Sequence, residues 1–164
     1  MTERIFVSLG SNLGEREENL KKARKEIAKL GNILKSSSIY ETEPVGYKEQ
    51  QKFYNQVVEI ETTIVPETLL EACLEIETRL GRVRTIKNGP RSIDIDILLY
   101  GNKIMKQNII LPHPRMSERA FVLVPFAEIA AEVVHPEKKQ TIALLLQQVP
   151  KEEKSNVSKV QTKQ

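Results

Sequence analysis

The most informative segment of the chain is Ile93-Asp94-Ile95-Asp96-Ile97-Leu98-Leu99-Tyr100, which begins with strictly alternating apolar and acidic residues. A period of two is typical of a β-strand, so we expect the isoleucines on one face and Asp94 and Asp96 on the other. Upstream, from Pro66 to Gly81, apolar side chains recur three or four residues apart. This spacing predicts an amphipathic helix that precedes the strand.

Elsewhere in the chain, the same patterns predict strands at residues 5–9, 33–40 and 53–63 and a helix that ends near residue 30. Gly10-Ser11-Asn12-Leu13-Gly14 predicts the turn into that helix. The order β-α-β-β-α-β is typical of an α+β, ferredoxin-like split-βαβ fold, an antiparallel sheet with helices on one face. Helices at about 117–131 and 141–148 are C-terminal additions. We expect one domain over residues 1–149 and a disordered polar tail over residues 150–164.

Composition narrows the class of protein. Of 164 residues, 40% are hydrophobic and 29% charged, as in an ordinary globular protein. No apolar run approaches the roughly 20 residues that a membrane-spanning helix needs, and no apolar segment follows a basic N-terminus. The single cysteine, Cys73, excludes an internal disulfide. We therefore expect a cytoplasmic protein with no membrane partner.

The basic character lies mostly in the tail. Residues 150–164 hold four lysines and two glutamates, which is +2 of the net charge of +3. The rest is nearly neutral, which argues against an extended nucleic-acid interface. A ferredoxin-like nucleic-acid-binding module stays an alternative, but it predicts cations and aromatics on the sheet, where this chain has Asp94 and Asp96.

Asp94 and Asp96 are the strongest candidates for chemistry. Carboxylates two residues apart on a strand point the same way and can bind a hard cation such as Mg²⁺. Residues 79–91 add five basic side chains and no acid, and arginines bind phosphate oxygens bidentately. A metal-bound polyphosphate would satisfy both groups. The alternatives are a strand with one hydrated face and a solvated basic loop. No glycine-rich phosphate-binding motif is present, so side chains would have to hold the phosphates.

Two further places suit a ligand. Phe53 and Asn55 share the strand face opposite Tyr54, Val58 and Ile60, so a ring and an amide could bind a planar heterocycle. The alternative is that the sheet is covered on both faces and Phe53 belongs to the core. His113, between two prolines, could donate to a phosphate or be an ordinary surface residue.

Several motifs in this order resemble one family. They are Gly10–Gly14, Tyr40–Gly46, Phe53-Tyr54-Asn55, Gly81-Arg82-Val83-Arg84, Lys87–Leu98, Pro112–Met116 and Arg119-Ala120-Phe121. Over roughly residues 4–135 the chain resembles the 6-hydroxymethyl-7,8-dihydropterin pyrophosphokinases of folate biosynthesis. The block from Gly89-Pro90-Arg91 to Asp94 and Asp96 is the most specific.

The resemblance implies an ATP-dependent transferase that moves the β,γ-pyrophosphoryl group to the pterin hydroxymethyl oxygen and releases AMP. It implies a monomer or weak dimer with two small-molecule substrates, ATP and the pterin. By motif, Asp94 and Asp96 would bind two Mg²⁺ ions and act in catalysis with Arg82, Arg84 and Arg91. The nucleotide would be bound by Glu77, Arg82, Arg84, Lys87, Arg91, His113 and Arg119. The pterin would be bound by Thr42, Pro44, Val45, Phe53, Asn55 and Phe121.

One departure from the family pattern is visible. The family usually has Arg-Trp before Gly89-Pro90-Arg91, where this chain has Lys87-Asn88, and the chain contains no tryptophan. A planar guanidinium becomes a point charge and an aromatic ring becomes a small amide. We expect activity to be retained, with a catalytically weakened pterin-binding relative as the alternative. We also expect residues 82–91 to form a lid that orders over ATP.

Overall fold

The computed structural model describes residues 3–43, 50–81 and 92–161. The elements are β1 (Ile5–Ser11), α1 (Arg16–Ile27), β2 (Asn32–Ser36), β3 (Tyr40–Thr42), β4 (Phe53–Glu61), α2 (Pro66–Arg79), β5 (Asp94–Tyr100), β6 (Met105–Gln107), β7 (Ile109–Leu111), a short 3₁₀ helix (Met116–Glu118), α3 (Ala120–Ala130), α4 (Ile142–Gln148), α5 (Lys151–Ser155) and β8 (Val157–Lys159). None of the helices in these ranges is long and apolar enough to cross a membrane.

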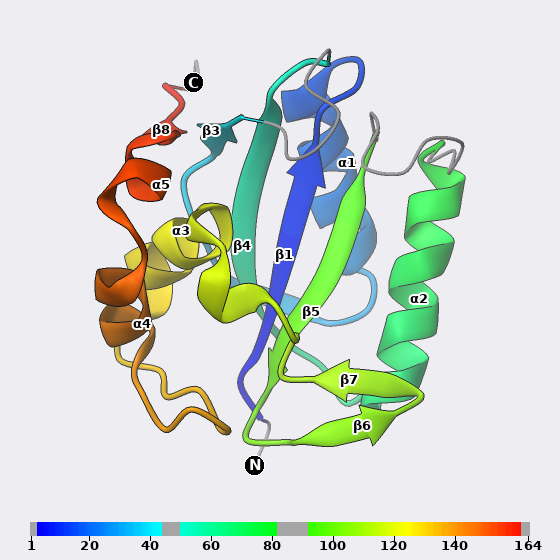
Figure 1. The fold of residues 1–164 in the computed structure, drawn as a ribbon. Helices are drawn as coiled ribbons and strands as arrows, with labels where there is room; N and C mark the ends of the chain where they lie inside the picture. The colour runs from blue at the N-terminus through cyan, green and yellow to red at the C-terminus, as the bar shows by residue number, and fades with distance from the viewer. Residues whose placement is uncertain (1–2, 44–49, 82–91, 162–164) are drawn as a thin grey trace.

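A central sheet organises the chain, with strand order β5-β1-β4-β3-β8 and β2 also paired with β4 (Figure 1). All pairings in it are antiparallel. The strand expected at 33–40 is two short strands, β2 and β3. Between them, Ser37 uses its hydroxyl to accept the Val57 N–H at 3.0 Å. A side-chain acceptor thereby replaces a ladder carbonyl, and this interrupts the strand.

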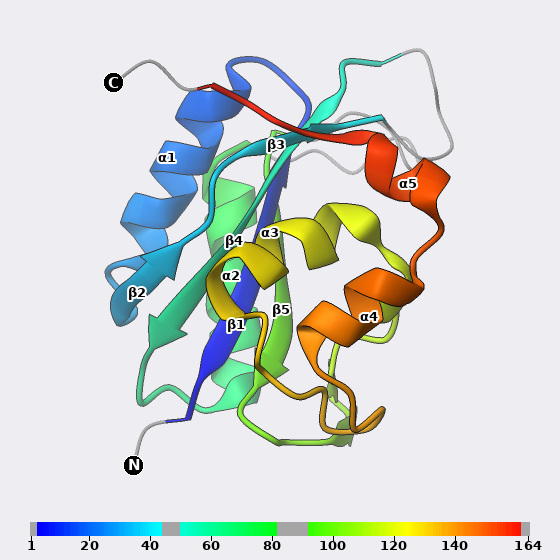
Figure 2. The same ribbon diagram turned by 90° about the vertical axis from the view of Figure 1, so that its left-hand side faces the viewer.

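Helices cover both faces of the sheet. On one face, α1 and α2 pack on residues such as Val7, Val58 and Ile97. On the other, α3 and α4 pack on Phe6, Val57 and Leu98 (Figures 1 and 2). The first two helices lie on one face, as expected, and the C-terminal additions cover part of the opposite one. The predicted placement of Val57 and Val58 on opposite faces of their strand is therefore correct, and both faces of the sheet hold apolar residues.

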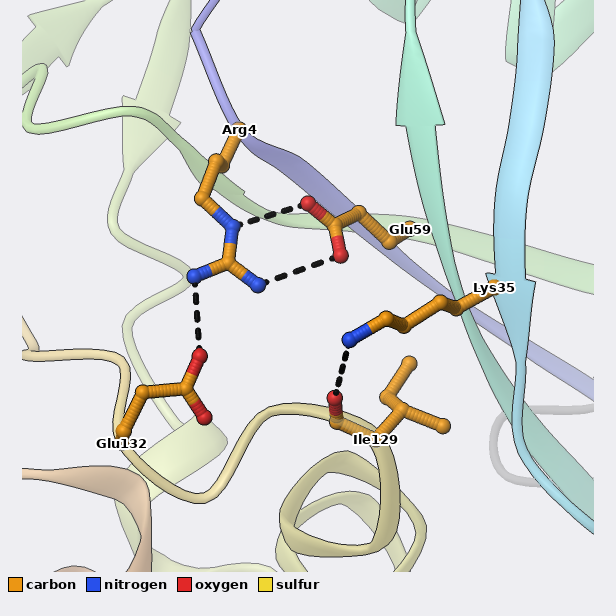
Figure 3. Close-up of polar contacts among 5 residues, drawn as sticks. All are labelled: Arg4, Lys35, Glu59, Ile129 and Glu132. Carbon is orange, nitrogen blue, oxygen red and sulfur yellow. Dashed lines mark hydrogen bonds and ion pairs between the residues drawn. The ribbon is translucent and has the colours of Figure 1, made fainter.

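A polar cluster fixes α3 to one end of the sheet (Figure 3). Arg4 donates from Nε and Nη2 to the buried carboxylate of Glu59 at 2.8 and 3.2 Å, and from Nη1 to Glu132 at 3.0 Å. Lys35 donates to the carbonyl of Ile129 at 3.4 Å. Because the Glu59 carboxylate is buried, leaving it without the Arg4 guanidinium would be costly. These contacts hold the helix over the Arg4 end of β1, away from Gly10.

The expectation of a disordered tail is wrong as far as Gln161. Residues after Pro150 form α5 and then β8, which pairs with β3 (Figure 2). Two apolar side chains anchor the segment. Val157 packs with the apolar cluster between the sheet and α3 and α4 (the α3 core), and Val160 packs with the cluster between the sheet and α1 and α2 (the α1 core). An exposed strand edge offers unpaired backbone groups, and β8 satisfies those of β3. The polar composition of residues 150–161 gives no indication of these valine contacts or of the pairing with β3.

His135 provides a pH-sensitive contribution to stability. Its buried ring accepts the N–H groups of Glu137 and Lys138 at Nδ1, at 3.2 and 3.1 Å. Burial, reinforced by the charges of Lys138 and Lys106 and partly offset by Glu137, lowers the pKa of His135 below 6.5. Protonation would remove the acceptor that closes this turn.

We expect the free energy of unfolding to fall as the pH drops below about 6.5, because the unfolded state then binds more protons than the folded state. Denaturant titrations from pH 7.5 to 5 measure this slope. His135→Asn should make it shallower, since an amide oxygen can accept the same hydrogen bonds without titrating. A slope from His113, whose pKa is lowered to about 4, should remain. Equal slopes in the two proteins would contradict the assignment.

Candidate active site

The site is built on three neighbouring strands at the end of the sheet away from Arg4. In the register of β1, Gly10 lies between Asn55 of β4 and Asp94 of β5, and Ser8 lies between Val57 and Asp96. Residues opposite one another point to the same face. With strands about 4.8 Å apart, the Asn55 and Asp94 backbones lie about 10 Å apart across β1.

Gly10 makes the centre of this surface open. A Cβ at this position would lie 3.1 Å from Oδ1 of Asn55, 3.6 Å from the Phe53 ring and 3.9 Å from Cβ of Asp94. Any side chain would therefore fill the space that these three residues surround. A glycine within a strand often marks such a close approach.

The predicted pterin residues that the structure describes on β3 and β4 lie together. Asn55 donates from Nδ2 to Oγ1 of Thr42 at 2.8 Å, and both side chains are buried. Thr42 is also the register partner of Phe53, whose side chain is partly exposed. Phe53 thus adjoins the Gly10 opening instead of being sealed in the core.

The acidic pair occupies the edge strand β5, and both aspartates are partly exposed. Between them, Ile95 donates its N–H to the carboxylate of Glu77 at 2.7 Å. Glu77 lies on α2 and is 3% exposed. Glu77 was expected to bind the nucleotide. The structure places its carboxylate on the backbone that presents Asp94 and Asp96.

His113 lies beside the acidic pair. The backbone N–H of His113 donates to the carbonyl of Leu98 at 2.9 Å, and the ring Nε2 lies 4.0 Å from Oδ1 of Asp96. Burial first, and then the charge of Arg119, lowers the pKa of His113 to about 4. The ring is therefore neutral at pH 7, and the contact with Asp96 is not an ion pair. With Nδ1 accepting from the Arg115 N–H at 3.3 Å, Nε2 carries the proton. His113 is mostly buried and is no ordinary surface histidine.

Arg119 and Phe121 stand at the start of α3. The Arg119 guanidinium carbon lies 5.5 Å from the centre of the Phe121 ring, and Phe121 packs against the α3 core while remaining partly exposed. Six other predicted residues lie outside the described ranges, and so does the lid expected at 82–91. They are Pro44, Val45, Arg82, Arg84, Lys87 and Arg91.

Gly10 lies at the centre of the candidate site, although its sequence pattern predicted only a turn. β1 in fact continues to Ser11, and Asn12 does not cap α1. Its amide donates to Oε1 of Gln50 at 2.7 Å and to the carbonyl of Gln51 at 3.1 Å. The sequence held one indication that Gly10 belongs to the strand, because it directly follows the alternating run from Ile5 to Leu9.

The carboxylates of Asp94 and Asp96 suit Mg²⁺ that is bound together with a substrate. The described residues contain no group of three or more histidine, cysteine or acidic side chains placed to bind a metal. Mg²⁺, however, is usually held by one or two carboxylates and by substrate phosphates. Asp94 and Asp96, on one face and accessible, meet that requirement.

Comparisons with known proteins identify the family of this chain. The family described as 7,8-dihydro-6-hydroxymethylpterin-pyrophosphokinase (HPPK) matches residues 6–131. The chain belongs to the HPPK family. Its relative in Bacillus subtilis, named 2-amino-4-hydroxy-6-hydroxymethyldihydropteridine pyrophosphokinase, is 46% identical over 149 residues, which cover 87% of this chain and 86% of that protein. The resemblance inferred from the motifs is confirmed.

Some relatives in the HPPK family are much longer. The folic acid synthesis protein fol1 of Pneumocystis carinii is 42% identical over 90% of this chain, which spans only 20% of that protein. Among solved structures, a Plasmodium falciparum HPPK-DHPS triple mutant with pteroate superposes with a TM-score of 0.73 over 97% of this chain and 47% of that one. At 16% identity that likeness shows a shared fold.

Proposed function

We propose that this chain transfers the β,γ-pyrophosphoryl group of ATP to the hydroxymethyl oxygen of 6-hydroxymethyl-7,8-dihydropterin and releases AMP. The observation that carries the proposal is the row across β4, β1 and β5. It puts a stacking ring and an amide on one side of Gly10 and two carboxylates on the other, on one face. Membership of the HPPK family supports the same reaction.

In this proposal the pterin binds on the β4 side. Phe53 and Phe121 enclose its ring, since aromatic faces stack on planar heterocycles. The Asn55 amide pairs with the ring edge, and its orientation is fixed by the bond to Thr42. Pro44 and Val45 are assigned to the pterin by the motif resemblance alone.

The nucleotide binds on the β5 side. Asp94 and Asp96 would hold two Mg²⁺ ions, which neutralise phosphate charge when bound. His113, neutral and protonated at Nε2, donates to a phosphate oxygen, and Arg119 adds a guanidinium. The motif resemblance assigns Arg82, Arg84, Lys87 and Arg91 to the triphosphate. Glu77 acts through the β5 backbone, as a positioning residue for the acidic pair.

The reaction asks the chain mainly for alignment. The hydroxymethyl oxygen forms a bond to the β-phosphorus, the bond from that phosphorus to the oxygen of AMP breaks, and the hydroxyl proton leaves to solvent. Holding both substrates across one glycine supplies the proximity on which such transfers depend.

The finer description of the fold is also a proposal. The adjacency β5-β1-β4 with β2 and β3 beyond, and α1 and α2 on one face, supports a ferredoxin-like split-βαβ core. We assign residues 1–149 to the pyrophosphokinase domain and extend it by β8. A cytoplasmic location and a monomer or weak dimer remain predictions, the latter measurable by sedimentation.

The deciding experiment mixes the protein with Mg²⁺, ATP and the pterin and separates the nucleotide products. AMP that forms only with pterin present supports the proposal, and ADP would indicate a different transfer. Tight pterin binding without AMP would favour the second candidate, a catalytically weakened relative, which Lys87-Asn88 suggests.

We expect Phe121→Ala to weaken pterin binding roughly ten- to hundredfold, because stacking on one aromatic face is lost. Equilibrium fluorescence titration with the pterin measures the effect. Phe121→Tyr keeps the ring and should bind the pterin like the wild type. In Phe121→Ala the Arg119 guanidinium loses its ring contact, so the Kd for a Mg²⁺–ATP analogue should rise, but far less than the Kd for the pterin. An unaltered pterin affinity in Phe121→Ala would remove this residue from the pocket.

A further inference from the structure

The C-terminal strand β8 touches the proposed pterin side of the site through a short chain of contacts. In register, Thr42 of β3 lies opposite Phe53 on one side and opposite Val157 of β8 on the other. The strand that presents the Thr42 hydroxyl to Asn55 is therefore held between β4 and the C-terminal segment.

β3 is short, and apart from side-chain contacts such as Arg16 with Glu41 and Tyr40 with Glu128, it is held by backbone pairing with β4 and β8. It contains three residues, Tyr40–Thr42, and without β8 it would be the edge of the sheet. Short edge strands with few backbone partners open readily. The Asn55 amide, whose Nδ2 donates to Thr42, would lose its fixed orientation whenever β3 opened.

β8 is anchored on both faces of the sheet. Val157 packs with the α3 core, Val160 packs with the α1 core, and the Val160 N–H donates to the carbonyl of Ile39 at 2.8 Å. On α3, Glu128 accepts from the hydroxyls of Ser38 and Tyr40 at 2.8 Å each. Burial acts to raise the pKa of Glu128, but its hydrogen bonds to Ser38 and Tyr40 and then the charge of Lys159 lower it overall. The tail and α3 therefore act on the same short strand.

We propose that residues 150–161 are a positioning element of the pterin pocket. β8 holds β3 in place, β3 holds the Thr42 hydroxyl, and that hydroxyl orients the Asn55 amide toward the substrate. The inference rests on the proposed function, because it assigns to the tail a role in binding that substrate. Asp94 and Asp96 lie on β5, at the opposite edge of the sheet, so nucleotide binding should not depend on the tail.

The test breaks one backbone pair. Hydrogen-bonded pairs alternate along an antiparallel ladder, so after the Ile39–Val160 contact the next such pair is Glu41–Ser158. Ser158→Pro removes the N–H at this position, whereas Ser158→Ala removes only an exposed hydroxyl. A chain ending at Val149 removes the whole element, which keeps the question answerable if the proline variant fails to fold.

We expect Ser158→Pro and the shortened chain to raise the pterin Kd by about tenfold, the scale of one lost, well-oriented hydrogen bond. Ser158→Ala should match the wild type. The Kd for a Mg²⁺–ATP analogue and kcat at saturating pterin should stay within about twofold in all three. Unchanged pterin affinity in both disrupted proteins would overturn the proposal, and so would an equal loss of pterin and nucleotide binding.

A double-mutant cycle separates positioning from general stability. Thr42→Val removes the acceptor for Asn55, so its effect on pterin binding should not add to that of Ser158→Pro. Full additivity would contradict the proposed route. If the wild type neither bound pterin nor formed AMP, the proposed function would fail, while amide exchange at Thr42 and Asn55 in Ser158→Pro would still report whether β8 holds β3.

Discussion

Asp96→Ala is expected to lower kcat for AMP formation by at least about a thousandfold, the largest effect of any single substitution considered, because both metal binding and phosphate alignment depend on this carboxylate. Asp96 is partly exposed on β5, beside His113 and across from Ser8. Its loss should therefore leave the core intact. Steady-state AMP production at saturating substrates, with Mg²⁺ varied, measures the effect.

Asp96→Asn is the matched variant, since it keeps the shape and one oxygen but removes the charge. We expect it to be nearly as inactive as Asp96→Ala, with the melting temperature and the pterin Kd of both variants close to the wild type. The Kd for the ATP analogue should lose most of its Mg²⁺ dependence. Wild-type turnover in Asp96→Ala would show that the acidic pair is not the metal site.

Gly10→Val is expected to reduce kcat/KM for the pterin by about a hundredfold, because small displacements of aligned substrates carry penalties of this size. Even a Cβ would lie within 3.1 Å of the Asn55 amide oxygen. The two added methyl groups must then displace Asn55, Phe53 or the substrate. Gly10→Ala, with a single methyl, should show an intermediate loss of about tenfold.

Gly14→Ala is the control for the effect of losing a glycine. Gly14 has a φ of +70° and no neighbour closer than 4.0 Å to an added Cβ, so its substitution strains the backbone without filling the site. It should lower the melting temperature and leave pterin affinity unchanged. Gly10→Ala should do the reverse. Unchanged pterin kinetics in Gly10→Val would mean that the substrate does not lie over β1.

Much of the fold follows from local pattern. The period of two in β5 predicted that Asp94 and Asp96 face away from the isoleucines, and the structure confirms it. The helical spacing after Pro66 predicted α2, which the structure begins at that residue. Such patterns predict a helix or strand well when one of its faces lies against the core along its whole length.

The tail was misjudged for a related reason. Only two apolar residues, Val157 and Val160, hold a polar segment in place, and each packs on a different core. Their contribution depends on an open strand edge more than 100 residues earlier in the chain. No local property of residues 150–161 reveals that edge.

The order of the amino acids was enough to predict the residue types and their faces: a pair of carboxylates on one side of a strand, and a ring and an amide on one side of another. It also determined the family, through motifs spread along the chain. Three relations came from the folded chain instead: Gly10 separates the two groups, Glu77 binds the backbone of the acidic strand, and β8 pairs with β3. Those relations depend on strand order and register, which long-range backbone pairing sets and which local periodicity does not contain.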